Sequence, residues 1–285
     1  MTDNWGEAPG NEFTVARHQE KSDDKDAERR KVGTILEVRD LTKQFYKNKQ
    51  LFTAVDHISF QLQQGECLGI VGESGCGKST TVKMLTHLLR PDGGEILLDG
   101  SEIQYLKGKE LKNLYTEIQM VFQTPQDSFD PRRTLGDGIM ESMINQGISK
   151  RQARERMEQL LQQVELPVEL AERRPDQVSG GQCQRAAIAR ALAIEPKILI
   201  CDEATSALDV TVQAQIVDLL KRLQKEMNLS ILLICHDLAL VQYLCDRVLV
   251  MYQGKIMEEG EPDTVIHSPE SDYTKMLVEA AMLGQ

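Results

Sequence analysis

The hydrophobic and polar positions separate a polar N-terminal stretch from a body in which strand-like and helix-like patterns alternate. Residues 1–33 carry mixed charges and little apolar periodicity, so they cannot bury enough surface to offset the entropy of the chain. We therefore predict a disordered tail there. From Ile35 onward the pattern changes. Residues 57–66 alternate apolar and polar side chains, which predicts an antiparallel strand that ends at Gly65.

Short apolar runs and helical repeats follow one another through the body. The runs at 67–72, 197–203 and 230–237 predict strands, and 248–260 predicts a hairpin that turns near Gly254. Helical spacing occurs in residues 80–89, 186–194 and 212–227, and in one apolar face formed by Met157, Leu160, Leu161 and Val164. Buried strands that alternate with helices indicate a parallel α/β core.

Composition and charge narrow the classes of protein. Of the 285 residues, 41% are hydrophobic, which is ordinary for a protein with a proper core. The net charge of −11, without a long Lys/Arg block, argues against nucleic acid as the main partner.

No run is long enough for a membrane-spanning helix and no secretory signal begins the chain, so a cytosolic location is expected. The six cysteines lack metal-ligand spacing, and buried free thiols are predicted.

The strongest motif is a Gly-rich loop between an apolar strand and a helix. Residues 72–80 read GESGCGKST and match the phosphate-loop pattern G-x-x-x-x-G-K-[ST]. Glycines let the backbone wrap around phosphates, toward which N–H groups and the helix N-terminus point. We expect Lys78 to hold the β- and γ-phosphates of a nucleoside triphosphate and Ser79 to ligate Mg²⁺. The nucleotide-binding candidates in the loop are Gly72, Ser74, Gly75, Gly77, Lys78, Ser79 and Thr80.

Two adjacent carboxylates follow the apolar run 198–201. Sites in α/β proteins form at the carboxyl ends of strands, so Asp202 is expected to reach the Mg²⁺ shell. Glu203 is then placed to accept a proton from the attacking water or to orient it. The alternative is a pair of solvated turn carboxylates.

A second Gly-rich turn lies at residues 178–182, which read VSGGQ. It resembles the signature of ATP-binding-cassette (ABC) ATPases, usually written LSGGQ. The resemblance implies that Ser179 and Gly181, with Gly180 and Gln182 beside them, bind the γ-phosphate of an ATP held by the opposite subunit. Such a turn offers N–H donors and the positive end of a helix dipole. Taken alone, it could equally be a helix-capping turn.

Other motifs of the same family follow in the family's order. Gln123 in QMVFQTP resembles the Q-loop residue that contacts Mg²⁺ and water and senses the membrane partner. Residues 206–209, which end in Asp209, resemble the D-loop that crosses the dimer interface. His236 resembles the switch histidine that contacts the γ-phosphate. We therefore expect Glu203, His236 and Gln123 to serve catalysis.

An aromatic residue upstream completes the set of motifs. Phe45 in LTKQFY resembles the residue that stacks on adenine, with Tyr46 as the alternative and a packing role open for either. The resemblance implies a phosphate-loop NTPase of the ABC type with a RecA-like parallel-sheet core, an antiparallel β subdomain and a helical signature subdomain. The expected divisions are a tail at 1–33, a nucleotide-binding domain at 34–262 with its helical part at about 124–185, and a C-terminal family tail at 263–285.

The family resemblance also implies an assembly. Two ATPase domains meet head to tail around two ATP molecules, so this chain needs a second ABC ATPase subunit, which is either another copy or a paralogue. In a transporter the closing motion passes to two transmembrane permease subunits. The expected place of the chain is then peripheral, at the cytoplasmic face of the cell membrane.

Soluble ABC ATPases that act in translation or DNA repair are the competing class. Translation-linked members carry two cassettes and basic elements, whereas this chain has one cassette and is acidic. Repair members insert long coiled coils, but only about 55 residues separate Gln123 from Ser179. A transporter is therefore favoured.

Two segments indicate which family of transporters the chain resembles. Residues 121–139 resemble the Q-loop region of the dipeptide, oligopeptide and nickel importer family, with Thr124 in place of Asp and Phe129-Asp130 in place of Leu-Asn. Residues 267–280, HSPESDYTKMLVEA, resemble the tail of that family. Such importers use an external substrate-binding protein. An iron–sulfur cluster is not expected, because the tail is not rich in cysteine.

Overall fold

The computed structural model of the chain describes residues 33–47, 50–204 and 209–283. Residues from Gly33 onward belong to a single unit. The tail predicted for residues 1–33 lies outside the described residues, apart from Gly33. No helix in the described part of the chain is long and apolar enough to cross a lipid bilayer.

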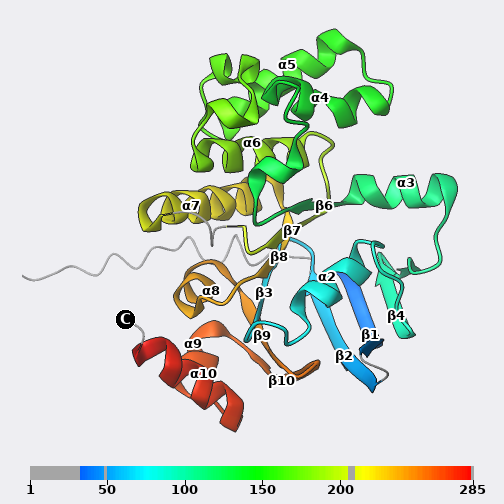
Figure 1. Cartoon of the computed structure of the whole chain (residues 1–285), viewed down its shortest axis with the longest axis vertical. Coiled ribbons are helices and arrows are strands. Elements are labelled where there is room, and N and C mark those ends of the chain that lie inside the picture. The colour runs from blue at the N-terminus through cyan, green and yellow to red at the C-terminus, as the bar shows by residue number, and fades with distance from the viewer. Residues whose placement is uncertain (1–32, 48–49, 205–208, 284–285) are drawn as a thin grey trace, which may run out of the picture. The chain divides into compact units, whose positions relative to one another are not determined.

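A six-stranded sheet in the order β10-β9-β3-β8-β7-β6 forms the centre of this unit (Figure 1). Neighbours from β9 to β6 pair in parallel, which confirms the predicted parallel α/β core. Antiparallel β10 joins β9 in the predicted hairpin at Gly254. The strands are β3 (Cys67–Val71), β6 (Ile118–Val121), β7 (Ile198–Asp202), β8 (Ser230–Ile234), β9 (Arg247–Tyr252) and β10 (Lys255–Gly260).

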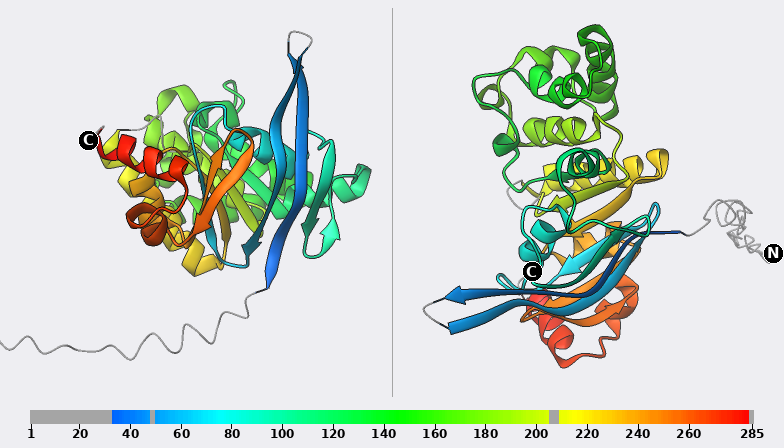
Figure 2. Two further views of the ribbon diagram at one scale, coloured as in Figure 1. Left: turned by 90° about the horizontal axis from the view of Figure 1, so that it is seen from below. Right: turned by 90° about the vertical axis from the view of Figure 1, so that its right-hand side faces the viewer.

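A second, antiparallel sheet has the order β2-β1-β4-β5. Its strands are β1 (Thr34–Lys47), β2 (Gln50–Gln63), β4 (Gly93–Leu98) and β5 (Ser101–Glu102). Figure 2 shows the long hairpin of β1 and β2. The alternation predicted near Gly65 is present in β2, where Ile58, Phe60 and Leu62 are buried and their neighbours in sequence are not.

Helices connect the strands and cover the large sheet. They are α2 (Lys78–Leu85), α3 (Gly108–Glu117), α4 (Leu135–Asn145), α5 (Lys150–Gln163), α6 (Gly180–Leu192), α7 (Val210–Met227), α8 (Leu238–Leu244), α9 (Pro262–His267) and α10 (Asp272–Leu283). Between β6 and β7 the chain forms α4, α5 and α6 in succession. The predicted apolar face of α5 is buried in full, since Met157, Leu160, Leu161 and Val164 are at most 3% exposed.

Helix α6 begins six residues earlier than the expected segment 186–194. Ser179 accepts a hydrogen bond from the backbone N–H of Gln182, and the Gln182 side chain accepts one from the backbone N–H of Ser179. This reciprocal capping box satisfies two backbone donors at the start of the helix, so helical structure extends through the two glycines that follow Ser179.

Both faces of the parallel sheet are buried, because alternate residues of its strands belong to two different hydrophobic clusters. In β7, Leu199 and Cys201 face the cluster that includes α6 and α7, whereas Ile198 and Ile200 face the cluster that includes α2 and the antiparallel sheet. Figure 1 shows α7 and α8 on one side and α2 on the other. All six cysteines are free and buried, as predicted.

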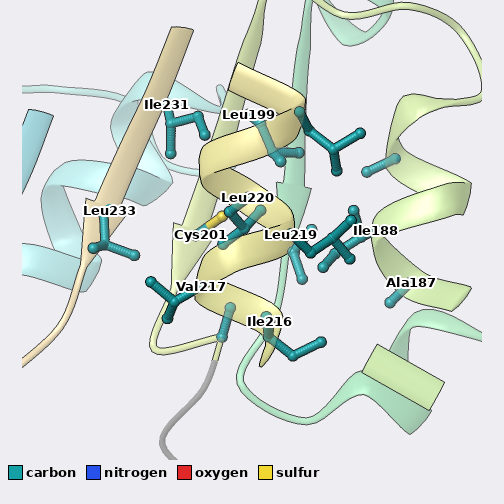
Figure 3. Packing of buried hydrophobic residues seen from close by; sticks show 14 of the residues in the cluster. Ala187, Ile188, Leu199, Cys201, Ile216, Val217, Leu219, Leu220, Ile231 and Leu233 are labelled. Carbon is teal, nitrogen blue, oxygen red and sulfur yellow. The ribbon is translucent and has the colours of Figure 1, made fainter. Parts of the chain in front are cut away.

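Helix α7 forms the middle layer of the larger cluster. Its residues Ile216, Val217, Leu219 and Leu220 lie between the side chains of β7 and β8 and those of α6 (Figure 3). Helix α7 therefore packs against both the strand that ends in Asp202 and the helix that begins after Ser179.

We expect Leu220→Ala to lower the free energy of unfolding by about 2–5 kcal/mol, since it opens a cavity between α7 and the sheet. Leu220 is 1% exposed, whereas Leu88 is 62% exposed. Leu88→Ala is therefore the matched control and should stay within about 0.5 kcal/mol of the wild type. Urea unfolding followed by circular dichroism measures both, and equal losses for the two variants would contradict the burial of Leu220 between α7 and the sheet.

Candidate functional site

The phosphate-loop sequence forms the turn between β3 and α2. At two of its positions, nearby backbone atoms leave room for glycine but not for a residue with a side chain. Gly72 has φ 149° and a Cβ there would lie 2.2 Å from the carbonyl oxygen of Met251. Gly77 has φ 115° and its Cβ would lie 2.4 Å from the carbonyl oxygen of Ala54. Any side chain at either position would displace backbone from the adjacent strands.

The Lys78 side chain is held inside this loop. It is 6% exposed, and its Nζ donates hydrogen bonds to the carbonyl oxygens of Gly72 at 2.6 Å and Glu73 at 2.9 Å. The ammonium group therefore lies at the start of α2, next to backbone N–H groups with no partner inside the helix. Positive charge and helix dipole together make this end of the loop attractive to an anion.

A cleft of about 320 Å³ opens beside the loop. Its walls combine the loop, an aromatic pair from the antiparallel sheet and the carboxylate after β7. The lining residues are Phe45, Phe52, Ala54, Ser74, Gly75, Gly77, Lys78, Ser79, Thr80 and Glu203. Predicted site residues from three distant parts of the sequence thus lie around one cleft.

The aromatic wall contains one residue that the sequence analysis missed. Phe45 and Phe52 are cross-strand partners in β1 and β2, and both line the cleft. Tyr46 does not line it and is 82% exposed. Phe52 could be found from the sequence only by knowing which residue of β2 pairs with Phe45. The pattern of apolar residues does not specify that register by itself.

The two acidic residues differ in their surroundings. Burial, followed by the charge of Glu203, raises the pKa of Asp202 above its usual range, and Lys78 and Lys83 oppose the rise. The Asp202 Oδ1 atom is buried and has no hydrogen-bond partner. Glu203 adopts a left-handed conformation with φ 49°, and its backbone N–H donates to the carbonyl oxygen of Ile234 at 2.9 Å. The turn after β7 is therefore tied to β8.

The signature residues lie around a different cleft. Ser179, Gly181 and Gln182 line a space of about 640 Å³ together with residues of α7, and Gly180 is exposed next to them. Among the described residues, none lines both this cleft and the one at the phosphate loop. The structure of one chain does not bring the two Gly-rich motifs together.

Asp202, Gly72 and Gly180 line neither cleft, and three further predicted residues share that property. Gln123 follows β6 and is exposed, and His236 follows β8 by two residues and is also exposed. Asp209 is the N-cap residue before α7, where its carboxylate accepts a hydrogen bond from the backbone N–H of Val212 at 3.0 Å. The rest of the predicted D-loop, residues 206–208, lies outside the described residues.

A family comparison matches this arrangement. Residues 55–206 match the model of the ABC transporter family. This segment contains the phosphate loop, Gln123, the signature turn and both acidic residues, and it ends before Asp209 and His236.

Known proteins similar to the chain include peptide transport subunits. The oligopeptide transport ATP-binding protein OppF of Escherichia coli K12 is 44% identical over 247 residues, which cover 86% of this chain and 74% of that protein. OppF of Salmonella typhimurium LT2 is 44% identical over 264 residues, which cover 89% and 78%. A putative peptide import ATP-binding protein of Brucella ovis is 42% identical, with 86% and 78% covered.

Solved structures extend the similarity to the fold. A dimeric, post-hydrolysis ATP-binding cassette MJ0796, bound to ADP and Pi, superposes with a TM-score of 0.73 at 30% identity over 80% of this chain and 98% of that one. The cassette cbiO1 of Clostridium perfringens superposes with a TM-score of 0.75 at 31% identity over 82% and 91%. Fold and site define a phosphate-loop ATPase, and the chain belongs to the ABC transporter family as one of its ATP-binding cassettes.

The raised pKa of Asp202 predicts a specific pH dependence of stability. A carboxyl whose pKa is higher in the folded than in the unfolded state adds stability at low pH, and that stability is lost as the pH rises through its folded pKa. We therefore expect Asp202→Asn to be at least as stable as the wild type at pH 8 without nucleotide. Its relative stability should fall as the pH is lowered through the range in which carboxyls titrate.

Asp92 serves as the control, because its pKa is shifted in the opposite direction to that of Asp202. A hydrogen bond from the backbone N–H of Gln44 and one from Lys43 lower the pKa of Asp92, so Asp92→Asn should lose stability at pH 8. Urea midpoints across pH measure both variants. A clear loss of stability in Asp202→Asn at pH 8 would show that its charge is already balanced in the folded chain.

Proposed function

We propose that this chain is the ATP-hydrolysing subunit of an ABC importer for peptides or a related small solute such as nickel. The observation that carries the proposal is the single cleft formed by Phe45, the phosphate loop and Glu203. Similarity to OppF at 44% identity over most of both chains supports peptides as the cargo. The cassette supplies the driving force, and specificity would belong to other subunits.

We infer that ATP enters this cleft with its base toward the β1–β2 hairpin and its phosphates in the loop. Phe45 stacks on adenine, and Phe52 across the hairpin widens the aromatic surface. Loop N–H groups and the side chains of Ser79 and Thr80 face the phosphates. Lys78 exchanges its contacts with loop carbonyl oxygens for the β- and γ-phosphates, where its charge offsets theirs.

Mg²⁺ fits the residues present beside the loop. The Asp202 carboxylate has a buried oxygen without a hydrogen-bond partner, and the cleft is lined by Ser79 and by Glu203, the residue after Asp202. Hard cations prefer such oxygen donors and retain several water and phosphate ligands, so a cluster of protein ligands is not required. The described residues contain no such cluster of three or more His, Cys, Asp or Glu side chains. We propose Ser79, Asp202 and Gln123 as its ligands, and its chemistry is charge neutralisation between the phosphates.

Hydrolysis would proceed by attack of water in line with the bond to the γ-phosphate. Glu203 lines the cleft and is suited to orient that water and accept its proton. His236 follows the strand next to β7 and would contact the γ-phosphate after a local adjustment. The remaining contribution of the protein is positioning and charge stabilisation.

A second ATPase subunit is needed for a complete site. The signature residues Ser179, Gly180, Gly181 and Gln182 lie at a cleft separate from the phosphate loop of the same chain, so a facing subunit would bring its signature to this ATP. Asp209 would lie near that interface. The dimeric state of MJ0796 with ADP and Pi supports this arrangement.

The remaining partners of the proposed importer are two transmembrane permease subunits and an external substrate-binding protein. The second ATPase is either another copy of this chain or a paralogue. In this assembly the chain sits at the cytoplasmic face of the membrane as a peripheral subunit. Nucleic acid is not among the proposed partners, in keeping with the net charge of −11.

Glu203→Gln should keep ATP binding and lose about 10²–10⁴-fold in turnover, because the amide cannot accept the proton of the attacking water. Glu155→Gln on α5, where the side chain is exposed, is the matched control and should hydrolyse ATP at the wild-type rate. Phosphate release by the membrane-assembled protein measures both variants. Near-normal turnover of Glu203→Gln would exclude Glu203 as the general base.

The assembly itself is tested by recovery of the tagged chain from gently solubilised membranes of its source cell. We expect two permeases and a second ATPase, or a second copy of this chain, to co-purify, and an untagged strain to yield none of them. Recovery with ribosomal or repair proteins and without membrane proteins would exclude the importer and favour a soluble ABC ATPase.

A further inference from the structure

The C-terminal helix α10 is fastened at its start to strand β10. The Glu258 carboxylate accepts hydrogen bonds from the backbone N–H groups of Glu270 at 2.9 Å and Ser271 at 3.0 Å. The Ser271 hydroxyl in turn accepts from the backbone N–H of Thr274 at 3.1 Å. Three backbone donors at the beginning of the helix are thereby satisfied, and the first turn of α10 has a defined place beside the β9–β10 hairpin (Figure 1).

The first turn of α10 carries Tyr273, which stacks on the last residue of β9. The rings of Tyr273 and Tyr252 have centroids 4.1 Å apart and planes inclined by 26°. Tyr273 is only 6% exposed. The residue before Tyr252 is Met251, whose carbonyl oxygen lies against Gly72 of the phosphate loop. The stack therefore brings the Tyr273 ring next to the beginning of the loop.

The hydroxyl of Tyr273 contacts the loop itself. Its oxygen accepts a hydrogen bond from the backbone N–H of Glu73 at 3.2 Å. The carbonyl oxygen of the same residue, Glu73, accepts a hydrogen bond from Lys78 Nζ at 2.9 Å. One residue of the loop is thus held by Tyr273 on one side and holds the phosphate-binding lysine on the other.

We propose that Tyr273 is a positioning residue for the phosphate-binding loop. Its hydroxyl accepts from the N–H of the peptide between Gly72 and Glu73, and the carbonyl oxygen of that same peptide accepts from Lys78 Nζ at 2.6 Å. Tyr273 thereby fixes this peptide plane, and with it the course of the backbone at the start of the loop. Gly72 and Gly75, on either side of Glu73 and Ser74, leave this part of the backbone with unusual freedom. A hydrogen-bond acceptor fixed outside the loop lowers the conformational entropy of the nucleotide-free loop. Nucleotide binding then has less conformational freedom to remove. The inference rests on the proposal that this loop holds ATP.

The ring and the hydroxyl of Tyr273 have separable roles. The ring packs against Tyr252 and contributes to the docking of α10, whereas only the oxygen reaches the loop. Tyr273→Phe removes that oxygen and keeps the stack. Tyr252→Phe removes the other hydroxyl of the same stack, for which the structure gives a side-chain partner, Gln253, outside the loop. Each variant therefore removes one tyrosine hydroxyl from the same stack. Only Tyr273→Phe removes a hydroxyl that contacts the loop residue bonded to Lys78.

The test measures the affinity of the full chain for Mg²⁺-ATP by calorimetry, in a Glu203→Gln background so that hydrolysis does not interfere. Loss of one neutral hydrogen bond should weaken ATP binding about three- to tenfold in Tyr273→Phe. Tyr252→Phe should bind within about twofold of its parent. In steady-state hydrolysis by the assembled protein with Glu203 intact, Tyr273→Phe should raise KM and change kcat less than about twofold, since the loop binds ground state and transition state alike.

Several results would overturn the inference. An unchanged ATP affinity in Tyr273→Phe, whether or not its thermal midpoint falls, would reduce Tyr273 to a packing residue. Equal weakening in both Phe variants would assign the effect to the stack and not to the hydroxyl. Failure of the parent chain to bind Mg²⁺-ATP at all would instead overturn the proposed ATP site, and this inference with it.

Discussion

The parallel pairing of β3, β8 and β7 is the constraint on which the candidate site depends. Ile70 pairs with Ile234, and Ile234 pairs with Asp202, so all three strands end at nearly the same level. The chain segments that follow them are the phosphate loop, the turn with His236 and the turn with Glu203. Because helices and the second sheet bury both faces of these strands, the register cannot slip without moving apolar side chains out of two hydrophobic clusters.

Local features of this arrangement were predictable from the sequence because they depend on short-range patterns. The buried strands are continuous apolar runs, and the apolar face of α5 repeats with helical spacing, so both are visible within ten or fifteen residues. The phosphate loop is identified by residue types whose reasons are local: glycines where backbone approaches closely, and a lysine at the start of a helix. The apolar segment 186–194 does not mark the start of α6, because the first turn of that helix is set by the capping box of Ser179 and Gln182, which the sequence analysis left open as an alternative to the signature.

Features that depend on contacts between distant residues were not predictable. Phe45 and Tyr46 are adjacent aromatic residues on opposite faces of β1, and only the pairing with β2 shows that Phe45 faces the cleft and has Phe52 beside it. The contact between Tyr273 and Glu73 joins residues 200 positions apart. No periodicity or spacing encodes such a contact, so the C-terminal segment could be identified by resemblance but not connected to the loop.

The acidic residues differ in how well the chain satisfies their carboxylates. Both carboxylate oxygens of Asp92 accept hydrogen bonds, one from Lys43 and one from the backbone N–H of Gln44. The Oδ1 atom of Asp237 accepts two from backbone N–H groups at the start of α8. Asp202 is more deeply buried than Asp92 and yet keeps an oxygen atom without a partner, while Glu203 beside it adopts a left-handed backbone that non-glycine residues disfavour. A buried oxygen without a partner is unfavourable in the chain by itself, and the cation of the proposed function would supply the missing partner. Under the proposed function, nucleotide binding would therefore stabilise the turn after β7, whose strand contributes Leu199 and Cys201 to the same hydrophobic cluster as α7 and α6.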